Sequence, residues 1–412
     1  MESFAGLLKL YQAVRRQTLR LTENLSAEDM VVQSMPDASP SKWHLGHTSW
    51  FFEEFVLREH LDDYQSFDES YSHLFNSYYE AVGDRHPRPQ RGLLTRPNLS
   101  SVLHYRAYVD SYMEKLLGER PDSLRNRIIT GLHHEMQHQE LLLTDILHLL
   151  SFNALSPAVY PSDDAPSSEP EPLGMQAYDG GLVQIGAARK GFSYDCEKPR
   201  HQVFLQPFRL AERPVSNREW LEFIAAGGYQ QPLLWLSDGW QARQDNDWQA
   251  PLYWRQVGGE WHQFGLDGLR PLNFAAPVCH VSYYEADAYA RWAGKRLPSE
   301  QEWEHAVGAA PVEGNFLEAA SWRPGPAIGK AEIGQAYGDV WEWTRSPYMA
   351  YPGFKPESGA LQEYNGKFMA NQFVLRGGSC VTPRRQMRAS YRNFFFPHQR
   401  WQFSGLRLAE DD

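Results

Sequence analysis

The sequence predicts a mixed α + α/β fold class, in which an N-terminal four-helix bundle precedes a loop-rich α+β domain. Long segments of helical periodicity end near residue 151, a segment rich in proline, serine and acids follows at residues 156–172, and short strand-like segments begin after it. The composition changes at the same point, since ten of the 15 histidines precede residue 150 and twelve of the 14 tryptophans follow residue 155. Two domains are therefore expected, at residues 1–155 and 173–412, joined by a linker at 156–172.

The spacing of apolar residues predicts four helices in the first domain, over residues 3–22, 41–57, 98–117 and 121–151. Asn98 or Ser100 is the expected N-cap of the third helix. Residues 60–97 form a loop-rich excursion between the second and third helices. Because four-helix bundles commonly hold metal ions on inward-facing side chains, the histidines of this domain are candidates for such a site.

The second domain is expected to contain short elements packed by aromatic side chains. Residues 182–185 and 202–205 have the pattern of strands, and residues 216–226 and 282–294 have the pattern of short helices. Ser282 is expected to cap the last of these helices and Gly294 to end it.

The composition excludes several classes of protein. Aromatic residues make up 14% of the chain, whereas disordered chains are poor in them, and three cysteines are too few for a disulfide scaffold. A net charge of -11 leaves no basic excess for nucleic acid, and no uncharged apolar run reaches the ~18 residues of a membrane span. With no leader pattern at the N-terminus, we expect a cytoplasmic monomer or homo-oligomer that binds neither nucleic acid nor membranes.

The strongest local signal is His134-Glu135-Met136-Gln137-His138, in the last predicted helix of the bundle. Two histidines at i and i+4 present their ring nitrogens one turn apart on one helix face, which suits a shared metal ion. Zinc metalloproteases carry the same pattern with the glutamate as general base, so a zinc hydrolase using Glu135 is one interpretation. Two core or surface histidines without a metal are another.

A third ligand would distinguish these interpretations. Downstream of His138 the helix runs toward the acidic linker and offers His148, whereas upstream Trp43-His44-Leu45-Gly46-His47 begins another helix of the bundle. Either His44 or His47 can complete a three-nitrogen face, and Glu140 is a candidate outer hydrogen-bond acceptor. Three neutral imidazoles leave coordination positions open, as Fe(II) requires when it binds both O2 and a substrate, although such sites also hold zinc.

Four separated motifs mark the second domain, namely Pro214–Trp220, His280–Ala286 continuing to Arg291–Glu300, Gly338–Thr344 and Leu375–Ser379. They occur in the order typical of formylglycine-generating enzymes. The second domain therefore resembles the formylglycine-generating-enzyme (sulfatase-modifying factor) fold, a C-type-lectin-like α+β domain, over residues 175–410. Those enzymes bind copper through a closely spaced cysteine pair near the C-terminus, whereas Cys380 stands alone here, so that activity is not expected.

The first domain resembles a DinB-like four-helix bundle, with the patterns W-x-L-x-H at residues 43–47 and H-E-x-Q-H-x-E at residues 134–140. A DinB-like bundle followed by a formylglycine-generating-enzyme-like domain resembles the iron-dependent sulfoxide synthases of ergothioneine biosynthesis, the EgtB family, over nearly the whole chain. The resemblance implies an Fe(II) ion bound by His47, His134 and His138, which favours His47 over His44.

That family joins a thiol to C2 of the imidazole of hercynine (Nα-trimethylhistidine) and oxidises the sulfur with O2. With that substrate beside the metal ion, Gln137, which lies between two ligands in sequence, is expected to hydrogen-bond its imidazole, and Asn393 is the candidate for binding the hercynine carboxylate. The trimethylammonium group has no N–H donor and needs aromatic faces, which Phe394 and Phe395 offer, although core packing is the alternative role of these rings.

The loop-rich excursion contains two further sets of candidates. The reaction needs a proton or hydrogen atom, and Tyr78 and Tyr79 are its expected donors, with Tyr348 and Tyr351 of the second domain as runners-up. Three arginines can hold the carboxylate of an amino-acid thiol through forked hydrogen bonds, or remain solvated in the loop. They are Arg85, Arg88 and Arg91.

The choice of thiol substrate is predicted from a sequence difference between this chain and some members of the EgtB family. Members that use γ-glutamylcysteine carry an acid and a basic residue in the segment matching residues 394–399, where this chain reads Phe-Phe-Phe-Pro-His-Gln. Free cysteine is therefore expected beside hercynine and O2, with γ-glutamylcysteine as the other thiol. Two alternatives stay open, a selenium-transferring relative that acts on hercynine in selenoneine synthesis and the zinc hydrolase using His134, Glu135 and His138.

Overall fold

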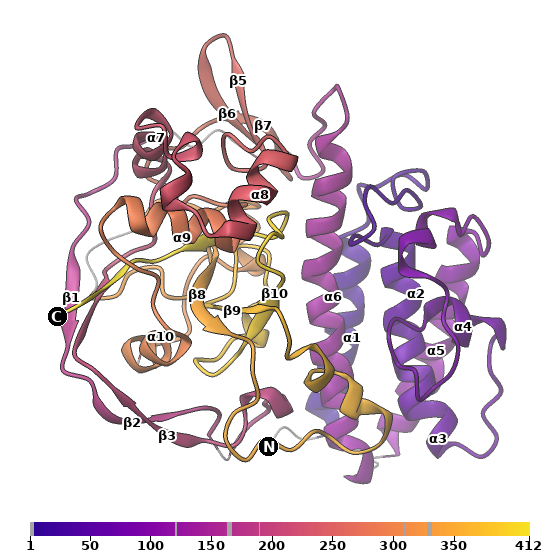
Figure 1. The fold of residues 1–412 in the computed structure, drawn as a ribbon. Coiled ribbons are helices and arrows are strands. Elements are labelled where there is room, and N and C mark those ends of the chain that lie inside the picture. The colour runs from indigo at the N-terminus through magenta and orange to yellow at the C-terminus, as the bar shows by residue number, and fades with distance from the viewer. Residues whose placement is uncertain (1–3, 120–121, 163–166, 189, 309, 328–331) are drawn as a thin grey trace. The chain divides into compact units, whose positions relative to one another are not determined.

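The computed structural model describes residues 4–119, 122–162, 167–188, 190–308, 310–327 and 332–412. It divides into two compact units, a helical one and one that mixes helices with small sheets (Figure 1). The helical unit comprises the chain up to Leu155 and the later segment Ser358–Tyr364, and the second unit comprises Ser156–Glu357 and Asn365–Asp412. The predicted fold class is confirmed, and one short segment returns to the helical unit from far along the sequence.

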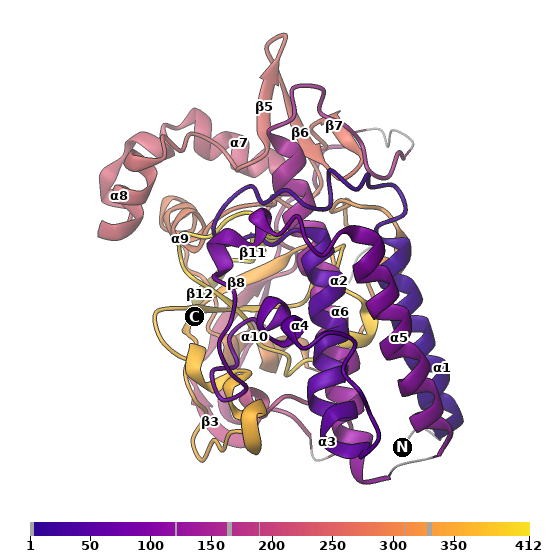
Figure 2. The same cartoon turned by 90° about the vertical axis from the view of Figure 1, so that its right-hand side faces the viewer.

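Four long helices form the bundle of the first unit. They are α1 (Phe4–Arg20), α2 (Ser41–Phe52), α5 (Leu99–Gly118) and α6 (Arg125–Ser151). Both α1 and α2 pack against α5 and α6, as the two views show (Figures 1 and 2). Asn98 is the N-cap of α5, because its side-chain oxygen accepts a hydrogen bond from the Ser101 N–H at 2.8 Å.

The predicted helix over residues 41–57 is present as α2 and a π-helical turn at Glu53–Leu57, and α3 (Arg58–His60) extends it. The excursion that follows contains two short helices that the sequence did not predict, α4 (Ser70–Phe75) and a 3₁₀ helix at Arg88–Leu93. The buried Glu53 carboxylate ties this excursion to α2, since it accepts hydrogen bonds from the Tyr64 hydroxyl at 2.6 Å and the Phe67 N–H at 3.3 Å. The apolar positions of α4 are too few to give a visible helical period.

The described strands of the second unit form four small sheets. The first has the order β1 (Met175–Tyr178), β4 (Phe208–Ala211), β12 (Ala409–Asp411), and the second has β10 (Asn393–Phe395), β9 (Phe373–Arg376), β8 (Trp341–Pro347), β11 (Ser404–Leu406). The others pair β2 (Gly181–Ile185) with β3 (His201–Leu205), and β6 (Glu260–Gly265) with β5 (Trp254–Val257) and β7 (Gly268–Pro271). The pairs are antiparallel except β8 with β11.

The helices of the second unit are α7 (Asn217–Ala225), α8 (Ser237–Asp245), α9 (Tyr283–Trp292) and α10 (Glu300–Val307). Three of them begin with the same capping box. A serine side chain accepts a hydrogen bond from the backbone N–H of a glutamate three residues later, and the carboxylate of that glutamate accepts one from the backbone N–H of the serine. The capping serines are Ser216, Ser282 and Ser299. This local pattern explains why such short helices start where they do.

The predicted linker is partly packed. Val159 and Tyr160 are buried, the Val159 N–H donates to the Leu266 carbonyl at 2.8 Å, and the Tyr160 ring stacks on Trp322 at 3.8 Å. Residues 163–166 lie outside the described residues. The first residues of this segment are therefore part of the packing of the second unit. Among the described helices, none has the length and apolarity needed to cross a membrane.

Candidate metal centre

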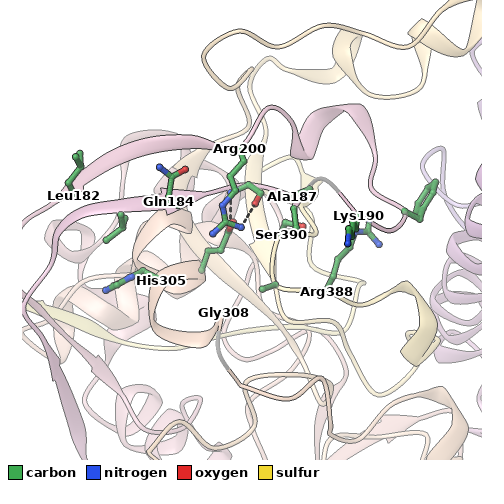
Figure 3. Close-up of a pocket in the computed structure, with 15 residues that line it drawn as sticks. Leu182, Gln184, Ala187, Lys190, Arg200, His305, Gly308, Arg388 and Ser390 are labelled. Carbon is green, nitrogen blue, oxygen red and sulfur yellow. Dashed lines mark hydrogen bonds between the residues drawn. The ribbon is translucent and has the colours of Figure 1, made fainter. Parts of the chain in front are cut away.

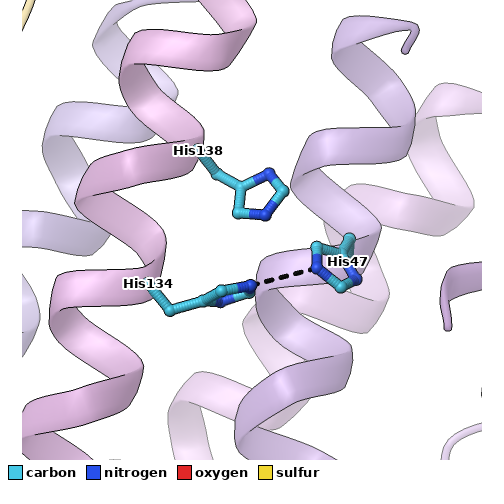
Figure 4. Close-up of side chains that lie close together, drawn as sticks. All are labelled: His47, His134 and His138. Carbon is cyan, nitrogen blue, oxygen red and sulfur yellow. Dashed lines mark hydrogen bonds between the residues drawn. The ribbon is translucent and has the colours of Figure 1, made fainter. Parts of the chain in front are cut away.

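Three histidines from two helices of the bundle converge on one point (Figure 4). His134 and His138 project from α6 one turn apart, and His47 faces them from α2. One ring nitrogen of each lies within 4.8 Å of the others, and the Nε2 atoms of His47 and His134 are 3.1 Å apart. Within the described part of the chain, this is the one group of at least three histidine, cysteine, aspartate or glutamate side chains with such spacing.

Hydrogen bonds on the far side of two rings determine which nitrogen faces the centre. The Nδ1 of His47 donates to the Phe75 carbonyl at 2.6 Å, which leaves the Nε2 lone pair free for a metal ion. The Nδ1 of His138 lies 2.8 Å from the Nδ1 of His44, so its Nε2 is the available ligand atom. The Nδ1 of His134 is buried without a hydrogen-bond partner among the described residues.

All three rings are held neutral by their surroundings. Burial lowers the pKa of His134 to about 3. Burial, followed by repulsion from the neighbouring histidines, lowers the pKa of His47 and His138 well below 6.5. Because a neutral imidazole keeps a free lone pair, protons do not compete with a metal cation here at neutral pH. The three donors therefore fit a divalent transition-metal ion.

Aromatic rings hold the imidazoles in place. His47 lies between Trp43 and Trp50, stacked on them with centroid separations of 4.5 and 5.4 Å, and Phe51 stacks on His134 at 4.4 Å. The two tryptophans stand four residues before and three residues after His47, so one face of α2 carries all three rings. Rotamers locked in this way preorganise a metal site.

A glycine next to His47 admits the carbonyl that orients it. A Cβ added to Gly46 would lie 2.3 Å from the Phe75 ring, which is closer than atoms of a folded protein tolerate. Glycine at this position therefore lets the end of α4 approach α2. The Phe75 carbonyl reaches His47 through this approach.

Glu135, between the two α6 histidines in sequence, is turned toward α1 and α5. Its buried carboxylate accepts hydrogen bonds from Thr18 Oγ1 at 2.6 Å, from Arg15 Nη1 at 3.0 Å and from Arg106. Burial opposes its ionisation, but Arg106 and Arg15 outweigh burial and lower the pKa of Glu135 to about 2. A carboxylate held by these partners is not available as the general base that the zinc-hydrolase interpretation requires.

A tyrosine that the sequence did not single out lies beside the ligands. Tyr364 ends the segment Ser358–Tyr364 of the helical unit, and its ring centroid is 5.8 Å from that of His134. Its hydroxyl donates to Gln137 Oε1. The carboxylate of Glu363 anchors the segment, because it accepts hydrogen bonds from the backbone N–H groups of Ala81 at 2.8 Å and Glu80 at 3.2 Å.

The proton donors predicted from the sequence, Tyr78 and Tyr79, lie close to the three histidines. Tyr78 and Tyr79 stack on each other at 4.6 Å, and the buried Tyr79 packs against Trp50 at 5.6 Å, one ring removed from His47. The runners-up belong to the second unit, where the Tyr351 hydroxyl is 3.2 Å from Glu300 Oε2. The structure therefore adds Tyr364 to the candidates and gives it a ring contact with a predicted ligand.

The three predicted arginines differ in their surroundings. Arg85 and Arg88 are exposed, and they bind Glu80 at 2.9 Å and the Asp37 carbonyl, respectively. Arg91 is 3% exposed and lies over the Trp43 ring, with its guanidinium carbon 3.4 Å from the ring centroid.

Arg91 is the arginine best suited to an anion. It donates to Ser39 Oγ at 2.9 Å, but its Nε has no hydrogen-bond partner among the described residues. Burial, and then the charges of Arg88 and Arg85, lower the pKa of Arg91 well below 12.5. A buried cation with an unmet donor gains from an anionic ligand.

The predicted substrate residues of the second unit, Asn393, Phe394 and Phe395, form β10 and are each half-buried. Phe394 stacks on Tyr348 at 4.0 Å and lies 5.9 Å from Phe368. Phe368 and Phe394 are half-buried, whereas Tyr348 is buried. The cluster therefore leaves part of two aromatic rings exposed, and a quaternary ammonium group can bind to such faces.

A cavity of about 640 Å³ lies within the second unit (Figure 3). It is bounded by β2, by the end of α10 and by residues 388–390, and the cations Lys190, Arg200 and Arg388 line it. None of the sequence-predicted site residues is among its lining residues.

Comparisons with known proteins match both parts of the chain. The DinB superfamily model matches residues 10–149, and the sulfatase-modifying factor enzyme 1-like domain model matches residues 163–336 and 329–412. Hercynine oxygenases of Mycobacterium tuberculosis and Mycolicibacterium smegmatis are 33% and 34% identical over 426 residues, which cover 96% of this chain and 96% of each relative. The formylglycine-generating enzyme of Mycobacterium tuberculosis is 30% identical over 237 residues, 44% of this chain and 76% of that protein.

Proposed function

The chain belongs to the hercynine oxygenase (EgtB-type) family, and from this premise we propose that it joins a thiol to C2 of the hercynine imidazole and oxidises the sulfur, using Fe(II) and O2, in ergothioneine biosynthesis. The observation that carries the proposal is the convergence of three neutral imidazoles on one point of the bundle. His47, His134 and His138 would hold the iron.

The proposed reaction balances with O2 as its oxidant. The C2–H bond of hercynine and the S–H bond of the thiol break and a C–S bond forms, which releases two electrons and two protons. Oxidation of the sulfur to a sulfoxide releases two further electrons, so one O2 is fully reduced. One oxygen atom enters the sulfoxide and the other leaves as water with the two protons. The bound Fe(II) ion supplies the redox chemistry and an acidic position for the thiol.

We assign the proton-donating role to Tyr364, with Tyr78 and Tyr79 as the alternatives. The support is that the Tyr364 hydroxyl already acts as a donor, to Gln137, while its ring contacts His134. The amide of Gln137 is the proposed partner of the substrate imidazole, since it lies between two predicted ligands in sequence.

The remaining residues are proposed to bind the polar ends of the two substrates. Arg91, with Arg85 and Arg88, would hold the carboxylate of the thiol, which we propose to be free cysteine. Asn393 would bind the hercynine carboxylate. The partly exposed rings of Phe394 and Phe395 would face the trimethylammonium group.

An oxygen-uptake assay tests the proposal. Protein loaded anaerobically with Fe(II) is mixed with hercynine and either cysteine or γ-glutamylcysteine in air-saturated buffer, and O2 uptake and product mass are followed. We expect equal amounts of O2 consumed and sulfoxide formed, with the faster turnover on cysteine. His104→Gln, at an exposed position of α5 outside the three ligands, is the matched control and retains turnover. Absence of a sulfoxide with both thiols contradicts the proposal, and a product formed only from a selenium donor points to the selenoneine-type relative.

A further inference from the structure

A chain of hydrogen bonds leads from the predicted ligand His138 to a buried carboxylate. The Nδ1 atoms of His138 and His44 are 2.8 Å apart, and His44 Nε2 is 3.1 Å from Asp145 Oδ2. The same carboxylate oxygen accepts the Ser39 N–H at 2.8 Å. His44 and Asp145 are 2% and 7% exposed, so solvent contributes little to the pairing.

One arrangement of protons on the two neutral rings satisfies this chain. When His138 binds a metal ion through Nε2, its Nδ1 carries the proton and donates to His44 Nδ1. The proton of His44 then sits on Nε2 and is donated to Asp145. Every donor of the chain then has an acceptor.

The two helices place these residues by simple spacing. Asp145 follows His138 by seven residues, which is about two turns of α6, so both side chains lie on one face. His44 precedes His47 by three residues on α2, about one turn. The helix face that presents His47 to the centre therefore also places His44 behind His138.

The three predicted ligands thus have different outer partners. His47 donates to a neutral carbonyl, His134 has no partner for its Nδ1 among the described residues, and His138 is backed by an imidazole and a carboxylate. An anionic acceptor makes a ligating imidazole more electron-rich and fixes its orientation.

Asp145 is also placed to offset part of the charge of the metal ion, and it shares its charge with the nearby Arg91. Three neutral imidazoles leave the cation uncompensated, and Glu135, the other buried carboxylate next to the ligands, is already paired with Arg15 and Arg106. Asp145 reaches His138 through a single ring.

We infer that His44 and Asp145 are positioning residues, which fix the tautomer of His138 and make it the most strongly donating of the three metal ligands. They thereby raise the affinity for the metal ion and lower the potential at which bound iron is oxidised. This inference rests on the proposed metal centre but not on the identity of the substrates.

Metal titration of two variants tests the relay. Asp145→Asn keeps an acceptor for His44 and removes the charge, whereas His44→Phe removes the link itself. Co(II) is titrated into metal-free protein and followed by its visible absorption, and Fe(II) affinity is measured against a competing chelator. We expect both variants to bind either ion on the order of 10- to 100-fold more weakly, with an altered Co(II) spectrum and a more positive potential of bound iron. His104→Gln, a change at an exposed position of α5, is the control and retains all three properties.

The outcomes separate the relay from the centre it serves. If the wild-type protein binds metal and Asp145→Asn leaves affinity, spectrum and potential unchanged, the relay is wrong while the metal centre stands. If the wild-type protein binds neither ion, the proposed centre fails and the relay with it. Should His44→Phe not fold, the near-isosteric Asp145→Asn alone decides the question.

Discussion

The hydroxyl of Tyr364 is the proposed proton donor beside the three histidines. It donates to Gln137 while its ring packs against His134, so replacing the hydroxyl alone leaves the ring contact in place. The role of this residue can therefore be separated from metal binding.

Tyr364→Phe is expected to bind Fe(II) as tightly as the wild-type protein but to form sulfoxide about 100-fold more slowly, since a positioned proton donor contributes at least that factor. Product mass and chelator competition measure the two effects. Tyr108→Phe, whose hydroxyl donates to the Gln65 carbonyl, is the matched control. A fast Tyr364→Phe variant beside a slow Tyr78→Phe or Tyr79→Phe variant would return the role to the residues predicted from sequence.

The neutral histidines make the metal-free protein sensitive to acid. The pKa of His134 is about 3 in the folded chain, against an ordinary value of 6.5. Between these values the unfolded chain binds a proton that the folded chain does not, so stability falls as the pH is lowered. We expect the Tm of metal-free protein to fall from about pH 7 to about pH 5, and His134→Gln to reduce the slope. A Tm that stays level or rises in the wild-type protein contradicts this.

At the scale of elements, α2 shows what the sequence could and could not predict. The i, i+4 spacing of His134 and His138 was sufficient to place them on one face of α6. His44 and His47 could not be ranked by spacing, because both lie on the side of α2 that faces α6. The structure uses both, His47 toward the centre and His44 behind His138. The role of Glu140 as an outer acceptor stays a prediction.

Gly46 is the residue of α2 whose replacement tests this packing. A methyl group there displaces the Phe75 ring and with it the carbonyl that orients His47. We expect Gly46→Ala to lower the free energy of unfolding by about 1–3 kcal/mol and to weaken Co(II) binding. Urea denaturation and metal titration measure the two effects. Gly118→Ala, at an exposed position with open space, is the control and is neutral or stabilising, and equal behaviour of the two variants would refute the packing argument.

Helix α6 presents two different faces, one with histidines toward α2 and one with Glu135 toward α1 and α5. Removing the charge of Glu135 leaves Arg106 buried without its anionic partner and leaves Arg15 with Asp110 alone. We expect Glu135→Gln to lose about 3–5 kcal/mol of stability while keeping its metal ion, measured by denaturation and metal content. Full stability with complete loss of turnover would instead revive the general-base role.

For the whole molecule, composition and motif order were enough to predict two parts with different folds. The return of Ser358–Tyr364 to the helical unit was not predictable, because Tyr364 meets Gln137 across 227 positions and no local pattern marks it. The packing of Tyr160 on Trp322 was not predictable either, because one aromatic residue among prolines and serines has no periodicity. Periodicity reports local structure, whereas these contacts join distant segments.

The predicted metal ligands lie in the helical unit, and the half-buried rings predicted to face the substrate cation lie in the second unit. We propose that the three histidines support an oxidation in which O2 supplies the sulfoxide oxygen. That oxidation is independent of which tyrosine donates the proton and of the relay behind His138.

Turnover under oxygen-18 gas tests this claim most directly. The iron-loaded wild-type protein, given hercynine and cysteine, is expected to form a sulfoxide carrying one oxygen-18 atom, and His47→Ala is expected to form none. A sulfoxide whose oxygen comes from water, or equal labelled product from His47→Ala, would contradict the account.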